Sequence, residues 1–238
     1  MQNLTKRRRI TLATNCILLA LVFFVFAVGF LPAKIAPIFR MDASVYYNGN
    51  LASSKVSFMF NVYEGEGEIE DILSILREKS VKATFFMGGC FAALHEETVR
   101  KIVLEGHELA NHGYFHKQHD KLSLQDNIME IRACESVLES ICGIKPHLFA
   151  PPSGAYSRTT VEAAKELGYL TVMWTKDTID WRDSSPSVVF SRATKNPKGG
   201  DLILMHPKAV TVSVLPQIID FYIGKGLRPV TVSENIIG

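Results

Sequence analysis

The chain has 238 residues, enough for one N-terminal segment and one domain with a full hydrophobic core. Hydrophobic residues make up 47% of the sequence and charged residues 21%, which is typical of a globular protein with one additional apolar segment. The formal net charge of +2 is too small to indicate a nucleic-acid-binding protein, so we expect no nucleic-acid partner.

An uncharged apolar segment runs from Ile10 to Ala33, directly after a cluster of basic residues. As an α-helix it would extend about 36 Å, enough to cross a hydrocarbon core of about 30 Å. The basic cluster predicts that residues 1–9 are a cytoplasmic tail and that the chain lies outside the cell membrane from Lys34 onward. Residues 10–33 are therefore predicted to be a transmembrane anchor. The alternative is a signal peptide that is cleaved near Ala33.

Residues 34–54 show no regular pattern and are predicted to form a stalk, after which a domain of residues 55–238 begins. There, short apolar runs alternate with amphipathic helical patterns. Seven strands in alternation with helices predict a mainly parallel α/β sheet, either a barrel or a doubly wound sheet. The strands are expected at 56–61, 83–87, 108–111, 147–150, 169–174, 201–206 and 228–232, and the helices at 69–79, 96–105, 123–141, 157–167, 187–194 and 212–223.

Several residues of interest directly follow a predicted strand. They are His112, Pro151, Asp177 and His206. In parallel barrels, side chains at the C-terminal ends of the strands converge on one face of the molecule. The sequence therefore predicts a functional site at that face.

His112 and His116 are four residues apart. If this turn is helical, the two imidazoles share one face and can bind the same metal ion. Two incidental histidines are the alternative at this point.

A second group of polar residues lies near the C-terminal strands. His206 ends an apolar run, where it is either a buried structural histidine or an acid/base catalyst. Asp177 and Asp180 either orient a histidine or cap a turn. Trp181 either lines a sugar-binding groove or belongs to the core.

In chain order, these motifs are more specific together than any one of them is alone. They are Asn61-Val62, Asn111-His112-x-x-x-His116, Phe149-Ala150-Pro151-Pro152-x-Gly154, Asp177-Thr178-Ile179-Asp180-Trp181 and Leu202–His206. This order resembles the polysaccharide deacetylase family, which is carbohydrate esterase family 4 with the NodB-homology domain, over residues 55–236. Within the family, the chain looks most similar to a membrane-anchored, sporulation-associated branch.

The resemblance implies a distorted TIM-like (β/α)7 barrel that removes acetyl groups from N-acetylated glycans such as peptidoglycan or chitin. His112 and His116 would hold a divalent metal, usually zinc, together with an Asp. His206, held by Asp180, would protonate the leaving amine. The residues expected along the substrate groove are Trp181, Leu204, Pro151, Pro152 and Tyr156.

The chain departs from the family pattern where water is activated. The first motif of the family reads Thr-Phe-Asp-Asp-Gly, base first and metal ligand second, but this chain has Asn61 at the base position and Val62 after it. Ala150 replaces the Arg that orients the base. An Asn amide accepts no proton at neutral pH, and loss of a general base typically lowers the rate by about 10²–10⁴. Two histidines also make a weak zinc site, because three protein ligands are usual.

Two functions are compatible with this pattern. The first is a metal-dependent deacetylase of cell-wall or spore peptidoglycan with reduced or altered activity, in which Glu64 or Glu66 takes the place of the lost carboxylates. The second is an inactive pseudo-deacetylase that binds glycan or a protein partner. The alternative for the two glutamates is a solvated acidic turn. The retained histidines and aspartates argue against a purely structural membrane protein.

Overall fold

The computed structural model describes residues 45–238 of the chain. The predicted tail, residues 1–9, the predicted anchor, residues 10–33, and most of the predicted stalk lie outside this range. Among the helices of residues 45–238, none has the length and apolar character that crossing a membrane requires.

A nine-stranded sheet forms the centre of the described domain, and all its paired strands are parallel. The strands follow the order β1-β6-β5-β4-β3-β2-β8-β7, with β9 paired to β2. The bounds of the strands are β1 Val45–Tyr46, β2 Lys55–Val62, β3 Thr84–Met87, β4 Glu108–Asn111, β5 Leu148–Phe149, β6 Leu170–Val172, β7 Lys176–Asp177, β8 Leu202–Met205 and β9 Arg228–Pro229.

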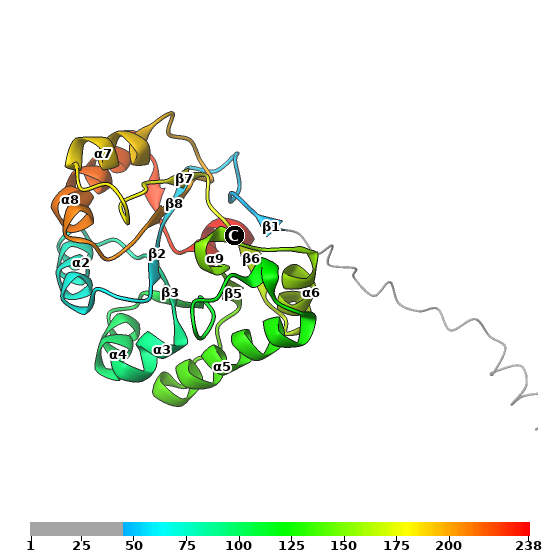
Figure 1. Cartoon of the computed structure of the whole chain (residues 1–238). Coiled ribbons are helices and arrows are strands. Elements are labelled where there is room, and N and C mark those ends of the chain that lie inside the picture. Colours follow the sequence, from blue (N-terminus) through cyan, green and yellow to red (C-terminus); the bar gives the residue numbers. More distant parts are fainter. Residues whose placement is uncertain (1–44) are drawn as a thin grey trace, which may run out of the picture. The chain divides into compact units, whose positions relative to one another are not determined.

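Helices surround the outer side of this sheet, as Figure 1 shows for α2, α4, α5, α7 and α8. The sheet is therefore a curled parallel half-barrel, in agreement with the predicted α/β class and consistent with a distorted (β/α)7 barrel. The helices are α2 Glu66–Glu78, α3 Gly89–Leu94, α4 Glu96–Leu104, α5 Leu124–Cys142, α6 Arg158–Glu166, α7 Pro186–Thr194, α8 Ala209–Gly224 and α9 Val232–Ile237, with short 3-10 turns at His119–Lys121 and Pro152–Gly154.

Local signals in the sequence set the ends of the long helices. The Ser123 hydroxyl caps α5 by accepting a hydrogen bond from the backbone N–H of Asp126 at 3.1 Å. Gly143 ends the same helix with φ of 68°, a left-handed conformation that glycine adopts without strain. Ser157 caps α6 in the same way as Ser123 caps α5, together with the side chain of Thr160. These caps confirm the helix starts that the serines predict.

Side chains of β2 alternate between two cores. Phe58, Phe60 and Val62 belong to the large cluster that packs against the surrounding helices. Met59 belongs to the smaller cluster inside the curled sheet. Because successive side chains of a strand point to opposite faces, Asn61 points to the inner side as Met59 does. This alternation decides which residues of β2 reach the inside of the barrel.

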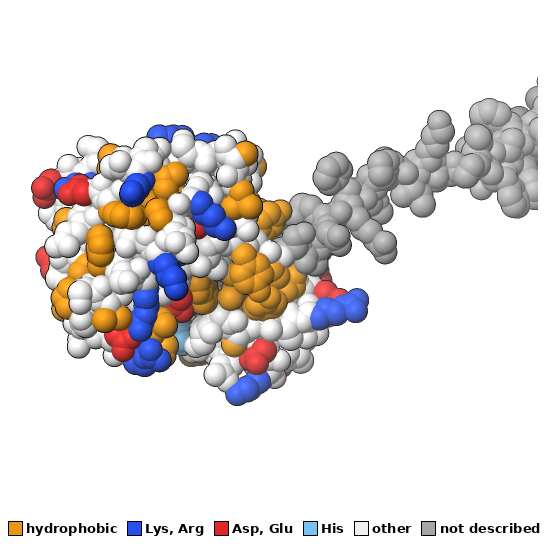
Figure 2. Space-filling view, turned by 90° about the horizontal axis from the view of Figure 1, so that it is seen from above, with side chains coloured by type: hydrophobic (Ala, Val, Ile, Leu, Met, Phe, Trp, Pro, Cys, Tyr) orange, Lys and Arg blue, Asp and Glu red, His pale blue; other side chains and the backbone are white. Residues whose placement is uncertain are grey.

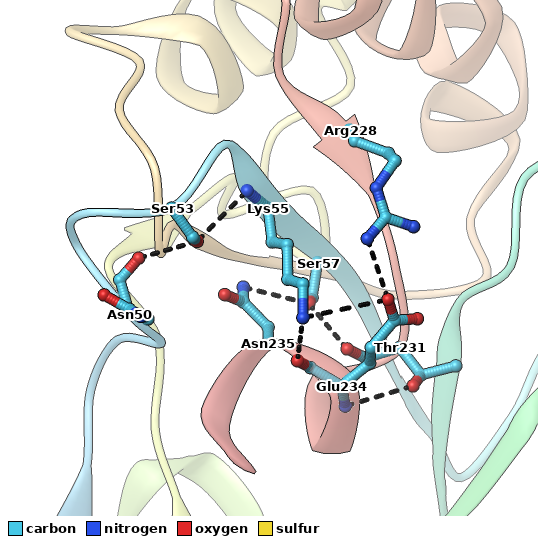
Figure 3. Close-up of polar contacts among 8 residues, drawn as sticks. All are labelled: Asn50, Ser53, Lys55, Ser57, Arg228, Thr231, Glu234 and Asn235. Carbon is cyan, nitrogen blue, oxygen red and sulfur yellow. Dashed lines mark hydrogen bonds and ion pairs between the residues drawn. The ribbon is translucent and has the colours of Figure 1, made fainter. Parts of the chain in front are cut away.

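The C-terminal helix α9 closes the end of the barrel at which β2 begins (Figure 3). The Ser57 hydroxyl donates to the Thr231 carbonyl at 3.1 Å, and the Asn235 amide donates to the Ser57 hydroxyl at 3.1 Å. The Lys55 ammonium donates to the Glu234 carbonyl at 3.1 Å. The opposite end of the barrel, at the C-terminal ends of the strands, is not covered by α9 and is available for a functional site.

Residues 45–54 belong to the domain, which corrects the predicted boundary at position 55. Val45 and Tyr46 form β1 and pair with Thr171 and Val172 of β6. The backbone N–H of Gly49 also donates to the Gly200 carbonyl at 2.8 Å. The prediction that residues 45–54 belong to a stalk was therefore wrong. A strand of two residues is too short to show an alternating pattern in the sequence, so the pattern could not reveal it.

Candidate functional site

A pocket of about 340 Å³ lies at the C-terminal ends of the strands. Asn61 comes from the end of β2 and Asp177 from the end of β7, while His112 and His206 directly follow β4 and β8. The predicted convergence is therefore confirmed for His112, Asp177 and His206, whereas Pro151 is not part of the lining. The full lining consists of Asn61, Tyr63, His112, His116, Ser153, Trp174, Asp177, Trp181, Leu204 and His206.

His112 and His116 lie side by side in the pocket, with ring centroids 5.2 Å apart. The turn that brings them together is not helical, because His116 has a φ of 54°; the helical spacing argument was wrong although the two residues do meet. His112 Nδ1 lies 2.7 Å from the Ala150 carbonyl oxygen, which can only accept, so Nδ1 donates and Nε2 is left free.

Both histidines of this pair are neutral at pH 7. Burial, and then the neighbouring imidazole of His116, hold the pKa of His112 well below its usual value. Burial and the nearby His206 lower the pKa of His116. The region around the two rings is therefore polar but carries no positive charge of its own at neutral pH.

His206 and Asp180 form a buried pair on the other side of the pocket. Asp180 accepts hydrogen bonds from His206 Nδ1 and from the His206 backbone N–H, both at 2.7 Å, and from the Thr211 hydroxyl at 2.5 Å. Burial alone would raise the pKa of Asp180, but these hydrogen bonds outweigh it and lower the pKa. The aspartate is ionised, so His206 Nδ1 carries a proton and Nε2 is free to act.

Asn61, near the end of β2, and Tyr63, directly after β2, both line the pocket. Asn61 is 2% exposed, and its side-chain oxygen has no hydrogen-bond partner within residues 45–238. The Tyr63 ring packs on His116, with centroids 4.1 Å apart, and lies edge-on to His206 at 6.3 Å. Burial, followed by the charge of Glu64, raises the pKa of Tyr63, which is therefore a neutral phenol.

The residues around His112 and His116 do not make a catalytic zinc site. Val62 is fully buried in the helix-facing core and does not line the pocket. Glu64 pairs with Lys208, and Glu66 pairs with His95 at 2.9 Å. Within residues 45–238, no group of three His, Cys, Asp or Glu side chains is arranged to hold a metal ion. Neither glutamate supplies the missing ligand, and two imidazoles are fewer than the usual three protein ligands.

The predicted groove residues separate into two sets. Trp181, which is 52% exposed, and Leu204 line the pocket. Pro151 and Pro152 are buried and are not part of the lining, to which the neighbouring Ser153 contributes instead. Tyr156 is not part of the lining, and its hydroxyl forms a hydrogen bond with that of Tyr47. These last three residues lie outside the pocket lining, and their place along a substrate groove stays a prediction.

Sequence reasoning missed Tyr63, Ser153 and Trp174 in the pocket. Tyr63 could have been found from its spacing, because it is two residues after Asn61 and shares the inner side with it. Trp174 follows β6, so the rule that strand ends converge applies to it as well. No strand pattern predicts Ser153 in the pocket, because it lies in the turn after β5 and has a φ of 57°.

The half-barrel and the histidine pocket at the C-terminal ends of its strands place the chain in the class of barrel proteins built like carbohydrate esterases. Residues 48–172 match the family model described as polysaccharide deacetylase, and the chain belongs to that family. The resemblance to this family, stated from the motifs, is thereby confirmed, and the sporulation-associated branch stays a prediction.

Three relatives illustrate the range of the family. The chain is 37% identical over 188 residues to the uncharacterized protein YlxY of Bacillus subtilis, covering 79% of this chain and 59% of that protein. It is 32% identical over 169 residues to a peptidoglycan-N-acetylglucosamine deacetylase of Bacillus cereus, covering 68% and 79%. The crystal structure of BA3943, a CE4-family pseudoenzyme from Bacillus anthracis, superimposes with a TM-score of 0.80 at 30% identity, covering 82% and 69%. The chain thus spans about three fifths of the length of YlxY.

Proposed function

We propose that this protein is a pseudo-deacetylase that binds N-acetylated cell-wall glycan, such as peptidoglycan, in the pocket without hydrolysing it. The observation that carries the proposal is the chemistry beside His112 and His116, where Asn61 stands at the position of the family's base and no third ligand completes a metal site within residues 45–238. An amide at position 61 cannot take a proton from water. Hydrolysis therefore lacks its first step.

The parts of the pocket that would bind a sugar are present. Trp174, Trp181 and Leu204 provide apolar surface, and Ser153 and Asp177 provide polar groups at the lining. The pocket volume of about 340 Å³ falls within the range of small-molecule sites. Aromatic rings beside polar groups are suited to a pyranose, which has both apolar faces and hydroxyl groups.

The relatives support both halves of the proposal. The Bacillus cereus relative is described as a peptidoglycan-N-acetylglucosamine deacetylase, which favours an N-acetylated glycan as the ligand. BA3943 is described as a pseudoenzyme, and a mutant of it as having restored enzymatic activity. A family member without turnover therefore has a precedent with the same fold.

The proposal includes the location of the domain. We infer that residues 10–33 anchor the chain in the cell membrane, because this segment is long enough to cross it, and that the domain lies outside in contact with the wall. If so, the full chain should sediment with membranes, and protease added to protoplasts should digest the domain. A shortened chain in the medium would support the cleaved signal peptide instead.

Acetate release tests the lack of hydrolysis. The purified full chain is incubated with chitotetraose and with peptidoglycan, each with and without added Zn²⁺, and its bound metal is measured. We expect no acetate above the protein-free control and less than stoichiometric zinc. Measurable turnover with stoichiometric zinc would contradict the pseudo-deacetylase and favour the metal-dependent enzyme.

Tryptophan fluorescence tests binding directly. The chain contains two tryptophans, Trp174 and Trp181, and both line the pocket. We expect chitotetraose to change the emission in a saturable manner. Trp181→Ala should weaken binding about tenfold, with Trp174 remaining as reporter, because one stacked ring contributes about 0.5–1.5 kcal/mol beyond its buried area. Phe115→Ala is the matched control, since Phe115 is 61% exposed and lies outside the pocket lining.

A further inference from the structure

Three large apolar side chains are exposed at the end of the barrel that α9 closes. Leu51 is 57% exposed, Ile223 48% and Ile237 71%. Leu51 lies in the loop before β2, Ile223 near the end of α8, and Ile237 in α9. Figure 3 shows that residues of this loop, of β2, of β9 and of α9 meet at this end. Large apolar side chains exposed together at one end of a domain indicate a surface for interaction.

Hydrogen bonds hold the segments of this end together. The Gly49 N–H donates to the Gly200 carbonyl at 2.8 Å, and the Arg228 N–H donates to the Ser54 carbonyl at 2.7 Å. The loop before β2 therefore contacts the segments that lead into β8 and β9. We call this end the basal face, and it consists of residues 49–54, 195–200 and 223–228 and of α9.

The basal face also carries lysines with uncompensated charge. They are Lys195, Lys198 and Lys225. All three are exposed, and none of them forms an ion pair within residues 45–238. Two aspartates at this end do not neutralise them, because Asp201 pairs with Lys176 at 3.1 Å and Asp220 pairs with Lys79 at 2.8 Å.

Lysines beside exposed apolar side chains are suited to the surface of a membrane. The ammonium groups attract anionic headgroups, and the apolar groups enter the boundary between headgroups and acyl chains. The C-terminus of a helix by itself favours a lysine, as at Lys195 and Lys225, but it does not favour an exposed leucine or isoleucine. The combination therefore points to an anionic lipid surface.

The chain enters the domain at this same end. β1 begins at Val45 and runs parallel to β6, so Val45 lies where the strands of the sheet begin. Residues 34–44 join β1 to the predicted anchor, and a chain of this length reaches no more than about 40 Å when fully extended. A membrane that holds residues 10–33 is therefore within reach of the basal face.

We propose that the basal face docks on the anionic surface of the membrane that holds the anchor. Its lysines bind lipid phosphates, and its exposed apolar side chains enter the headgroup layer. The pocket lies at the opposite end of the barrel, so docking directs the pocket away from the membrane and toward the wall. This inference rests on the membrane location in the proposed function and adds to it the orientation of the pocket.

A tryptophan placed on the basal face tests the docking. The full chain with Ile237→Trp is reconstituted into vesicles of phosphatidylcholine alone, or of equal parts phosphatidylcholine and phosphatidylglycerol, each with a headgroup-spin-labelled lipid as quencher. The wild type gives the baseline, because Trp174 and Trp181 line the pocket at the other end. We expect the added tryptophan to be quenched in the anionic vesicles and released at about 1 M salt, where the screening length is about 3 Å.

Charge reversal identifies the side chains responsible. In the Ile237→Trp chain, three substitutions are combined: Lys195→Glu, Lys198→Glu and Lys225→Glu. They should abolish the quenching, because each lysine near an anionic surface strengthens binding about fivefold. The matched control changes the net charge equally at exposed positions away from the basal face: Lys121→Glu, Arg132→Glu and Arg158→Glu. This control should keep the quenching of the Ile237→Trp chain.

The outcomes separate the two proposals. Equal quenching in the two kinds of vesicle, or quenching that survives reversal of the three basal lysines, would contradict this inference and leave the proposed function intact. A full chain that stays with neither kind of vesicle would contradict the membrane location and this inference together. An emission shift with soluble polyphosphate but not with anionic vesicles would assign the basal face to an anionic wall polymer and overturn the inference. Leu51→Trp is the second reporter if Ile237→Trp does not fold.

Discussion

The ring of Tyr63 packs on the ring of His116, with centroids 4.1 Å apart and planes inclined by 41°. The first motif of the deacetylase family ends in glycine at the position that Tyr63 occupies in this chain. A glycine leaves that side of the histidine open, whereas a phenol ring fills it. The lost carboxylates are therefore accompanied by a bulky side chain against one of the two remaining metal-type ligands.

Restoring a metal site should require the removal of this ring. We predict that Asn61→Asp, which places a carboxylate in the pocket lined by His112 and His116, gives little zinc binding by itself, and that adding Tyr63→Gly raises zinc content toward one per chain. Metal content after dialysis measures this. Tyr63→Gly alone is the control and should bind no more zinc than the wild type, since it adds no ligand. Equal zinc content in Asn61→Asp with and without Tyr63→Gly would show that Tyr63 does not obstruct the site.

The direction of the side chain at position 62 can be tested separately. Val62 is fully buried in the helix-facing core, so Val62→Asp places an unpaired carboxylate there and should lower the free energy of unfolding by about 3–5 kcal/mol. Val62→Ala removes only methyl groups and should cost less. Urea unfolding of both variants measures the difference. If Val62→Asp is the milder change, the side chain at this position reaches the pocket instead of the core.

Much of the fold follows from local patterns in the sequence. The predicted strand at 108–111 coincides with β4, and the predicted helix starts at Ser123 and Ser157 are confirmed by their capping hydrogen bonds. These features depend on residues close together in the chain, which is why a pattern displays them. β1 and α9 were missed because each is short and is held by distant partners, as Asn235 is by Ser57.

The site was predictable only in part, for a related reason. The rule that strand ends converge placed His112 and His206 correctly. It could not show that Glu64 is held by Lys208, because that ion pair joins loops far apart in the sequence. The conformation of His116, with its φ of 54°, likewise depends on tertiary contacts and not on the four-residue spacing.

On the face shown in Figure 2, Lys and Arg side chains are interspersed with apolar and uncharged groups. The absence of a nucleic-acid partner, which we expect from the net charge of +2, stays a prediction.

Stability should fall as the pH falls below neutrality, and His107 accounts for part of this. Burial, followed by the charge of Lys82, lowers the pKa of His107 to about 4. In the unfolded chain a histidine titrates near pH 6.5, so between these values the unfolded state holds one more proton. The free energy of unfolding should therefore decrease by about 1.4 kcal/mol per pH unit from this residue, and its contribution is complete above about pH 6.5.

Urea unfolding at pH 7, 6 and 5 measures this slope. His107→Gln removes the titrating group while its side-chain oxygen can still accept from the Ala83 N–H, which now donates to His107 Nδ1 at 3.2 Å. The slope of the variant should be smaller by about one proton. His147→Gln, at an exposed position, is the control and should leave the slope unchanged. An unchanged slope in His107→Gln would mean that His107 is not the group responsible.

Asp180 should be more important for stability than a surface aspartate, because it accepts three hydrogen bonds in a buried position. An amide at this position can accept through one oxygen only, and its NH₂ would face donors. We predict that Asp180→Asn lowers the free energy of unfolding by about 2–3 kcal/mol, since hydrogen bonds to a charged group contribute about 1.5–3 kcal/mol each and part of the network survives. Asp183→Asn affects an ion pair with Arg182 and Arg192 at the surface and should cost much less, because solvent screens such pairs.

The same substitution should also change the proton on His206. In the wild type, the ionised Asp180 keeps the proton on His206 Nδ1 and leaves Nε2 free toward the pocket. An asparagine can instead donate to Nδ1, which moves the proton to Nε2. Nitrogen chemical shifts of the histidine ring distinguish the two tautomers. If Asp180→Asn keeps the Nδ1–H tautomer, Asp180 stabilises the domain without controlling which nitrogen of His206 carries the proton.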